Sequence, residues 1–417
     1  MTNDLHTTGR SEAKSPTLDQ FLREAKRFLD EQAKPVNSTG AQWGEGSDRV
    51  ALQIVGNKPV AQDDADCAAT KAWRTSLWDG GVGWLQGPEW LGGRALPVEY
   101  ERAFRVLQGG YDVPDATYTR VGTTIVGPSI LKFGTPEVQQ EFLPGIHSGN
   151  RIMCQLLSEP EAGSDLANTK TRATRDGDGW RISGQKVWTS GARHADIGEC
   201  LAATGEPDAR HRGLTVFLVD MHAPGVEVRP LRQMTGGAEF GEVFLTDVWV
   251  ADAHRLGGIG EGWAVVIDTL MNERAAIGDD LLPDDSLVTR LIEVAWHTGR
   301  SSDPLIRQEL ADVVLRMRVL RMTSDRILGA LAPGEPPGAD LTMVKLAVTD
   351  NLARIGQLVG RLLGPAMTAD TGEWGTYAWA EFVLGVPGMR IGGGTDEILK
   401  NTIGERVLGL PREPMPV

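Results

Sequence analysis

The chain is poor in cysteine, has no long apolar run and shows no excess of basic residues. Its 3 cysteines, Cys67, Cys154 and Cys200, are scattered over 417 residues without a C-x-x-C spacing, so no disulfide framework is expected. No segment approaches the roughly 18 apolar residues that a membrane span requires. The polar opening "MTNDLHTTGRSEAKSP" lacks the apolar core of a signal peptide. We therefore expect a soluble protein of the reducing cytoplasm, with no membrane association.

Several kinds of functional site are also missing. The formal net charge of −14 at pH 7 leaves no basic stripe that could neutralise the phosphates of nucleic acid. The 7 histidines show no H-E-x-x-H or other metal-binding spacing, and no G-x-S-x-G marks a hydrolase serine. The nearest approach to a dinucleotide-binding loop, "GIGEG" at 258–262, has the wrong spacing. These absences argue against nucleic-acid binding, a bound metal and a Rossmann domain.

The pattern of apolar residues first indicates helices. Residues 1–16 are polar and predict a disordered N-terminal arm. From Leu18 to Leu29 the apolar residues follow a period of about 3.6, which is typical of an amphipathic helix. Helical patches of this kind continue to the end of the first third. We therefore predict an N-terminal α-helical domain over residues 17–149.

The pattern changes near Met153. Segments such as "WRISGQKVW" and "GEVFLTDVWV" alternate apolar and polar residues, which predicts a small β domain, a barrel or a sandwich, over residues 150–256. Long helical periods return over residues 257–417 and suit a C-terminal domain like a four-helix bundle. The order helix, strand, helix has no alternating βα units. It therefore predicts an α+β multi-domain fold.

The stretch from Gln155 to Ala192 carries the clearest functional signal. It begins "QLLSEPEAGSD" and ends "DGDGWRISGQKVWTSGA", so a small-residue turn precedes a strand that ends in adjacent aromatic and hydroxyl residues. That pairing suits a flat polar ring. The stretch resembles the signature region of the acyl-CoA dehydrogenase family, FAD enzymes that oxidise acyl-CoA thioesters. The tail "GGGTDEILKNTIGERVLGLPRE" extends the resemblance over nearly the whole chain and implies that family's fold.

The resemblance implies positions for the flavin ring. Gln155, Leu157 and Ser158 would line its pyrimidine edge, Trp188 would flank the ring, and Ser190 would donate toward N5. The family usually has Thr at the two serine positions, so the hydroxyls are kept. Taken alone, the tryptophan could equally pack a core and the serines could serve turns. The joined string, more than any single residue, favours a flavin site.

Further contacts are implied outside the ring. Ser164 would lie near both the flavin and the CoA moiety, and Thr395 and Glu397 of the C-terminal motif would contact the cofactor. Arg274 would lie beside the substrate. No metal is implied.

The reaction needs a carboxylate base, and its usual position is empty. Many family members have a Glu just before the Gly-Thr of the C-terminal motif, where this chain has Gly393. Others carry the base on the first long C-terminal helix, immediately before an Arg, and this chain has Glu273 there. Val266, Leu270, Glu273 and Ile277 share one helix face, so the carboxylate falls on an apolar stripe. A Glu at the edge of such a stripe, solvated or paired with an Arg, is the structural alternative.

Two other carboxylates lie near the C-terminal motif, Asp396 and Glu397. Both align better with positions that contact the cofactor. We therefore assign the base to Glu273 ahead of either.

One departure from the family affects assembly. Its members usually form dimers of dimers in which a neighbouring chain clamps the FAD pyrophosphate with an Arg and a later Gln. Here His297 stands where that Arg is expected, and Arg361 and Pro365 replace the Gln and the second Gly after it. A pyrophosphate prefers bidentate positive charge. The chain could form a homotetramer in which Arg300, Arg307 or Arg361 takes over, or an α2β2 heterotetramer with a divergent family member.

The implied reaction is α,β-dehydrogenation of an acyl-CoA thioester to a trans-2-enoyl-CoA, with hydride transfer to flavin N5, as in the β-oxidation of fatty acids or other lipids. An electron-transfer flavoprotein would be the acceptor. Three alternatives use the same scaffold. The chain could be one subunit of a heterotetramer acting on a bulky ester such as a steroid side-chain CoA, a mainly structural partner subunit, or a flavin oxidase or monooxygenase. These motifs do not fix the length or branching of the acyl group.

Overall fold

A computed structural model describes residues 15–36, 58–280, 285–329, 339–369, 371, 377 and 379–412. The predicted disordered arm over 1–16 therefore lies almost wholly outside the described residues, as does the side chain of Ile277. Among the helices within these ranges, none combines the length and the apolar character needed to cross a membrane.

The first third of the described chain is helical. Thr17 and Gln20 form a reciprocal capping box that starts the first helix, and Thr135 caps the last one through the Val138 amide. A segment of wider π-type turns, Val121–Val126, joins two of the short helices. The helices are α1 Leu18–Gln32, α2 Val60–Asp79, α3 Val98–Gln108, α4 Thr117–Arg120, α5 Gly127–Phe133 and α6 Pro136–His147. A small ladder pairs β1 Lys34–Pro35 with β2 Tyr111–Asp112.

The middle of the chain forms one eight-stranded sheet, in the order β10-β7-β6-β4-β5-β9-β8 with β3 paired to β6. The strands are β3 Met153–Leu156, β4 Arg172–Asp176, β5 Gly179–Ser190, β6 Ile197–Ala203, β7 Leu214–Asp220, β8 Val226–Leu231, β9 Phe240–Ala251 and β10 Arg255–Leu256. A single residue pair, Arg172 with Ala203, joins β4 to β6. The sheet thus divides into two halves that enclose a shared apolar core, closer to a sandwich than to a closed barrel.

Alternation along the central strands sends residues to two different cores. On β6, Cys200 and Ala202 join the core of the sheet, whereas Ile197 and Leu201 join a second core shared with α5, α6 and α7. Because side chains alternate along a strand, Glu199 points with Ile197 and Leu201 toward the helices. This two-sided burial explains why β6 reads as an almost continuous apolar run.

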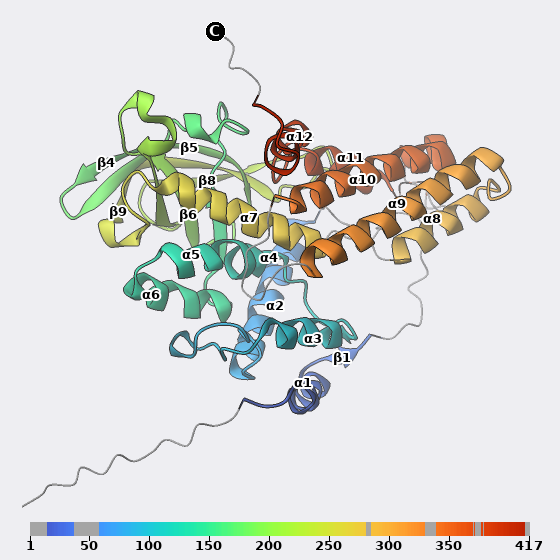
Figure 1. Ribbon diagram of the computed structural model, residues 1–417, viewed down its shortest axis with the longest axis horizontal. Coiled ribbons are helices and arrows are strands. Elements are labelled where there is room, and N and C mark those ends of the chain that lie inside the picture. Colours follow the sequence, from blue (N-terminus) through green and yellow to red (C-terminus); the bar gives the residue numbers. More distant parts are fainter. Residues whose placement is uncertain are drawn as a thin grey trace, which may run out of the picture.

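The last part of the described chain is helical again. The helices are α7 Gly262–Asp280, α8 Asp285–His297, α9 Pro304–Gly329, α10 Leu341–Leu363, α11 Ala380–Met389 and α12 Asp396–Thr402. Helices α8 to α11 surround an apolar core of their own. Helix α7 packs on β7, on the Val121–Val126 segment and on α10, so it lies where the sheet, the N-terminal helices and the bundle meet (Figure 1).

The changes of secondary structure fall between α6 and β3 and between β10 and α7. The predicted domain boundaries at 149/150 and 256/257 lie in these two connections. The division into separately folding domains stays a prediction.

Candidate functional site

A buried ion pair holds the turn that opens the signature stretch. The Lys186 side chain is 0% exposed, and its Nζ donates to Glu159 Oε1 at 2.8 Å. The same ammonium donates to the backbone carbonyls of Leu157 at 3.1 Å and Leu201 at 2.7 Å. All three of its protons therefore have partners. The turn after β3 is tied in this way to both β5 and β6.

The partner carboxylate is equally well used. Glu159 accepts from the backbone amides of Lys170 at 2.6 Å and Thr171 at 2.9 Å. Burial alone would raise the pKa of Glu159, but the Lys186 ammonium and these donors hold it below its usual value. The Val187 amide also donates to the Ser158 carbonyl at 2.9 Å. The backbone of the predicted flavin-edge turn is thus fixed on β5, directly before Trp188.

Trp188 has an unusual backbone and an exposed ring. Its φ is +59°, and the pairing of β5 with β9 shifts register between Lys186 and Thr189. A bulky residue at positive φ costs of order 1–3 kcal/mol and persists where a structure needs it. The side chain is nevertheless 60% exposed and is held at one edge by the Phe240 ring at 5.9 Å. The strand therefore presents a flat aromatic face outward at an energetic cost.

Some polar side-chain atoms of the signature stretch lack partners within the described residues. Gln155 Nε2 and Thr189 Oγ1 are buried without a hydrogen-bond partner in the described chain. Ser158 is half-buried, and Ser164 and Ser190 are exposed. A buried donor without a partner is costly unless something else satisfies it. The signature stretch thus offers an exposed aromatic face together with amide and hydroxyl groups, the kinds of group that the edge and face of a flavin need.

Glu273 lies on α7 beside this same region. Burial raises the pKa of its carboxyl, against the opposing influence of Arg274, Lys345 and the Gln155 amide. The residue keeps some solvent contact, but its carboxyl is enclosed. The Gln155 amide lies close enough to affect the carboxyl, although its nitrogen does not reach hydrogen-bonding geometry. The first residue of the signature stretch and the predicted base therefore lie side by side.

The glycine-rich turn before α12 closes over this area. Lys345 on α10 is buried, and its Nζ donates to the Gly394 carbonyl at 2.7 Å. Gly394 has φ +99°, and a Cβ added there would lie 3.3 Å from Leu399 Cδ2 and 3.9 Å from Arg274 Nη2. Glycine is therefore needed at this position for its backbone. The contact places Arg274 against the C-terminal motif.

The polar residues after this turn have different roles. Asp396 is buried, accepts from Thr349 Oγ1 at 3.0 Å and pairs with Arg390 at 2.7 Å. Thr395 caps α12 by accepting from the Ile398 amide at 3.2 Å. Glu397 is exposed. Asp396 is thus engaged in structure, and Glu397 is the accessible carboxylate of the motif.

Two of the three arginines considered for the pyrophosphate clamp form ion pairs within the chain, whereas the third, Arg307, is exposed and donates to the Ser301 carbonyl at 3.4 Å. Arg300 donates to the Arg361 carbonyl and lies 3.7 Å from Asp303. The Arg361 guanidinium pairs with Glu309 at 2.9 Å. Neither side chain presents an unpaired guanidinium to a ligand.

Sequence analysis missed several buried charged residues, among them Lys186 and Glu159, which brace the turn, and Glu199, which lies among apolar residues on β6. The signal for each was a single charged letter inside an apolar strand or beside a turn. Such a letter shows burial only when the fold of both strand faces is known. The predicted site residues are distributed over the signature stretch, α7 and the start of α12.

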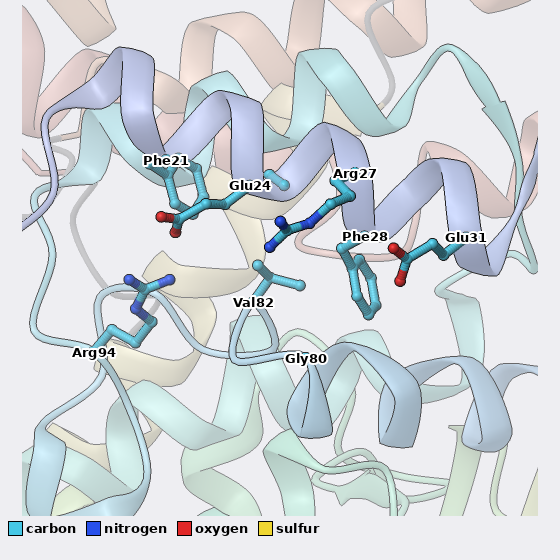
Figure 2. A pocket seen from close by; sticks show the side chains of 9 residues that line it. Phe21, Glu24, Arg27, Phe28, Glu31, Gly80, Val82 and Arg94 are labelled. Atoms are coloured by element: carbon cyan, nitrogen blue, oxygen red, sulfur yellow. The ribbon is translucent and has the colours of Figure 1, made fainter.

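A separate pocket of about 260 Å³ lies at the N-terminal helices (Figure 2). Its charged lining includes Glu24, Arg27 and Glu31 of α1 and Arg94 of the segment between α2 and α3. None of the predicted site residues lines it.

The sheet and the C-terminal helices resemble those of known proteins. Family models described as "Acyl-CoA dehydrogenase, middle domain" and "Acyl-CoA dehydrogenase, C-terminal domain" match residues 154–248 and 260–408. The chain is 39% identical to acyl-CoA dehydrogenase IpdE1 of Mycobacterium tuberculosis, over 82% of this chain and 88% of that protein. It is 27% identical to the human mitochondrial short-chain specific acyl-CoA dehydrogenase, over 68% and 71% of the two chains.

Solved structures share the whole architecture. The chain matches the ChsE4-ChsE5 complex from Mycobacterium tuberculosis with a TM-score of 0.71 at 25% identity, covering 97% of this chain and 100% of the other. It matches the Tcur3481-Tcur3483 steroid ACAD with a TM-score of 0.73 at 23% identity, covering 96% and 99%. The predicted fold class is confirmed.

Proposed function

The chain belongs to the acyl-CoA dehydrogenase family and is an oxidoreductase of that class. From this premise we propose that it is an FAD enzyme that converts an acyl-CoA thioester into a trans-2-enoyl-CoA, with Glu273 as the base. The observation that carries the proposal is the position of Glu273. Its enclosed carboxyl lies beside Gln155, the first residue of the stretch that would hold the flavin ring.

The residues toward the flavin have distinct tasks. Trp188 covers a face of the ring, and Gln155 Nε2 supplies a donor that no described residue uses. Leu157 and Ser158 line the pyrimidine edge, on a turn fixed by the Lys186–Glu159 pair. Ser190 would donate toward N5 of the flavin, and Ser164 would lie near both the flavin and the CoA moiety of the substrate. Thr395 and Glu397 extend the contacts to the rest of the cofactor.

The proton step belongs to Glu273. Its carboxylate removes the α-proton of the thioester, and the electrons of that C–H bond form the new double bond as hydride leaves the β-carbon. A bound flavin supplies the hydride acceptor. Burial brings the pKa of Glu273 up toward the working range of a general base. Arg274, next to it, contacts the C-terminal motif and lies beside the substrate.

Replacement of the carboxylate tests this assignment. In the FAD-loaded protein, Glu273→Gln keeps the flavin spectrum but slows bleaching by substrate by about 10²–10⁴-fold, the usual contribution of a general base. Glu141→Gln, an exposed carboxylate on α6, is the matched control and bleaches normally. Near-normal bleaching in Glu273→Gln would place the base elsewhere. Reduction of an electron-transfer flavoprotein, rather than peroxide formation, separates a dehydrogenase from an oxidase.

We also propose that this chain works within a heterotetramer that includes a divergent family member. Of the three candidate clamp residues, Arg300 and Arg361 already have partners within the chain, which leaves the exposed Arg307 with its single contact to the Ser301 carbonyl at 3.4 Å. Helix α9 exposes Leu315, Val319 and Met322 along one face, an apolar stripe that suits packing against another helical chain. The names of two structural neighbours, the ChsE4-ChsE5 complex and the Tcur3481-Tcur3483 steroid ACAD, support a paired assembly.

The name of the Tcur3481-Tcur3483 steroid ACAD suggests that the substrate has a bulky acyl group, such as a steroid-derived CoA ester. The family's usual base position is occupied by Gly393 between two further glycines, which removes side-chain volume near the C-terminal motif. A panel of straight, branched and polycyclic acyl-CoA esters, scored by flavin bleaching, tests this. Faster bleaching by straight-chain esters would contradict it.

A further inference from the structure

Glu199 is a buried acid that the reaction as described does not use. It lies on β6 between its register partners Gln155 on β3 and Leu218 on β7, and it is 0% exposed. Its side chain points into an apolar cluster that includes Val266 and Leu270 of α7. Burial, together with the nearby Glu273 and Asp268, raises the pKa of Glu199 to about 8, although Thr269 opposes the rise.

The hydrogen bonds around Glu199 also favour its neutral, protonated form. Thr269 Oγ1 lies 2.7 Å from Glu199 Oε1 and 3.0 Å from Ser129 Oγ, and Ser129 Oγ donates to Asp268 Oδ2 at 2.9 Å. Asp268 also pairs with the Lys132 ammonium, so it is a carboxylate. Thr269 and Ser129 have one hydroxyl proton each.

The Asn272 amide also donates to Ser129 Oγ at 3.3 Å and to Asp268 Oδ2 at 3.4 Å, but it does not reach the contact between Thr269 and Ser129. The count of hydroxyl protons therefore favours a neutral Glu199. If Glu199 were charged, Thr269 would donate to it and Ser129 to Asp268, leaving no proton between the two hydroxyl oxygens. If Glu199 is protonated, it donates to Thr269, Thr269 donates to Ser129, and Ser129 donates to Asp268. Every contact then has one proton. The chain of hydrogen bonds runs from the sheet across α7 to the charged pair at α5.

This chain of hydrogen bonds passes within one helical turn of the base, because Thr269 and Glu273 are four residues apart on α7. We propose that Glu199 is a positioning residue for Glu273: its neutral carboxyl completes the hydrogen-bond chain that fixes this turn of α7 on the sheet, and it withholds a second negative charge from beside the base. The proposal rests on the proposed role of Glu273.

The charged and titratable groups around Glu199 and Glu273 come from five elements. They are Asp268, Glu273 and Arg274 of α7, Lys345 of α10, Lys132 of α5, and the thiols of Cys154 and Cys200 on the opposite face of β3 and β6. Asp268 and Lys132 neutralise each other, and Arg274 and Lys345 face Glu273. None of these cations affects the pKa of Glu199, so its ionisation would leave a buried negative charge with no cation beside it.

That added charge predicts an alkaline limit on activity. Once Glu199 loses its proton, the hydrogen-bond chain is broken and a negative charge lies near Glu273. The charge disfavours the negative charge that develops on the thioester as the α-proton leaves. Activity should therefore fall as the pH rises through about 8.

The first test is the pH profile of kcat/KM for Glu199→Gln in the FAD-loaded protein. The amide can donate to Thr269 but cannot ionise. We expect activity within about twofold of wild type near pH 7 and loss of the alkaline limb, so that the variant keeps about tenfold more relative activity one pH unit above the wild-type midpoint. An unchanged alkaline limb, or loss of activity at pH 7 in the folded variant, would overturn the proposal.

Variants of Thr269 separate positioning from simple packing. Thr269→Ser keeps the hydroxyl and should keep the wild-type profile. Thr269→Val removes the hydroxyl that links Glu199 to Ser129, so the hydrogen-bond chain is broken at every pH and kcat/KM should fall below that of wild type across the whole profile. The same profile for both variants would contradict the chain.

A readout independent of activity separates this proposal from the role of Glu273. The folded-state pKa of Glu199 lies above its ordinary value of 4.5, so folding binds a proton, and the resulting stability is lost as the pH rises from 4.5 to about 8. The folding equilibrium constant of wild type relative to Glu199→Gln should fall by roughly tenfold per pH unit in this window. This measurement does not involve catalysis, so its outcome does not depend on whether Glu273 is the base. A ratio that does not change with pH would overturn the proposal.

Discussion

The two ends of the proposed cofactor site differ in how their polar groups are satisfied. At the sheet, Gln155 Nε2 and Thr189 Oγ1 have no partner in the described chain, and Trp188 exposes its ring at a strained backbone position. In the helical bundle, Arg300 and Arg361 are both engaged with groups of their own chain.

The difference shows which half of the site this chain supplies. Unsatisfied donors and an exposed aromatic ring are costly unless a ligand uses them. Arginines that already have partners would have to give them up to bind a pyrophosphate. We infer that the chain contributes the ring-holding half and the base, and that a second chain contributes the clamp.

The largest expected effect lies in the brace beneath the ring-holding half. Lys186→Met leaves the Glu159 carboxylate buried without its cation, so we expect a loss of about 3–5 kcal/mol in the free energy of unfolding. FAD binding should be lost with the turn. Urea denaturation and the flavin content of the purified protein measure the two effects.

The double variant Lys186→Met with Glu159→Gln is the matched control, because it removes both charges. It should be clearly more stable than Lys186→Met alone. Equal stability of the two variants would mean that the turn does not depend on the charge balance of this pair.

A smaller effect is expected at the ring itself. Because Trp188 has φ +59°, Trp188→Gly should be more stable than Trp188→Ala by about 1 kcal/mol, the reverse of the usual order. Both variants should bind FAD more weakly, since both lose the aromatic face. Thermal unfolding of the apo-protein and flavin fluorescence titration check these outcomes. A more stable alanine variant would show that the backbone is not strained there.

The smallest effect is expected on the clamp side. Arg361 pairs with Glu309 at the surface, so Arg361→Ala should change the free energy of unfolding by no more than about 1 kcal/mol. FAD content should not change. A marked loss of flavin in this variant would show that Arg361 clamps the cofactor in its own assembly, and the contrast between the two halves would disappear.

Periodicity predicted the fold well because it depends on local pattern. The helical first third, the strands between Met153 and Leu256 and the long C-terminal helices all appear where the spacing of apolar residues placed them. The predicted base could be placed on α7 because its neighbours share a helix face. Its proximity to Gln155 could not be predicted, since it depends on how α7 packs across the sheet.

The buried charges show the limit more sharply. Lys186 and Glu159 are 27 residues apart and meet only because β5 returns to the turn after β3. Glu199 reads as one acid in an apolar strand, and its partner Thr269 is 70 residues further on. Sequence spacing contains no signal for such long-range polar contacts. The site residues assigned by resemblance stay predictions.

The ratio of FAD to protein in the chain purified alone tests the central claim most directly. If the chain supplies only the ring-holding half, it should retain far less than one FAD per chain. Co-purification with a divergent family member should restore the flavin. A homo-oligomer of this chain that retains one FAD per chain would contradict the account.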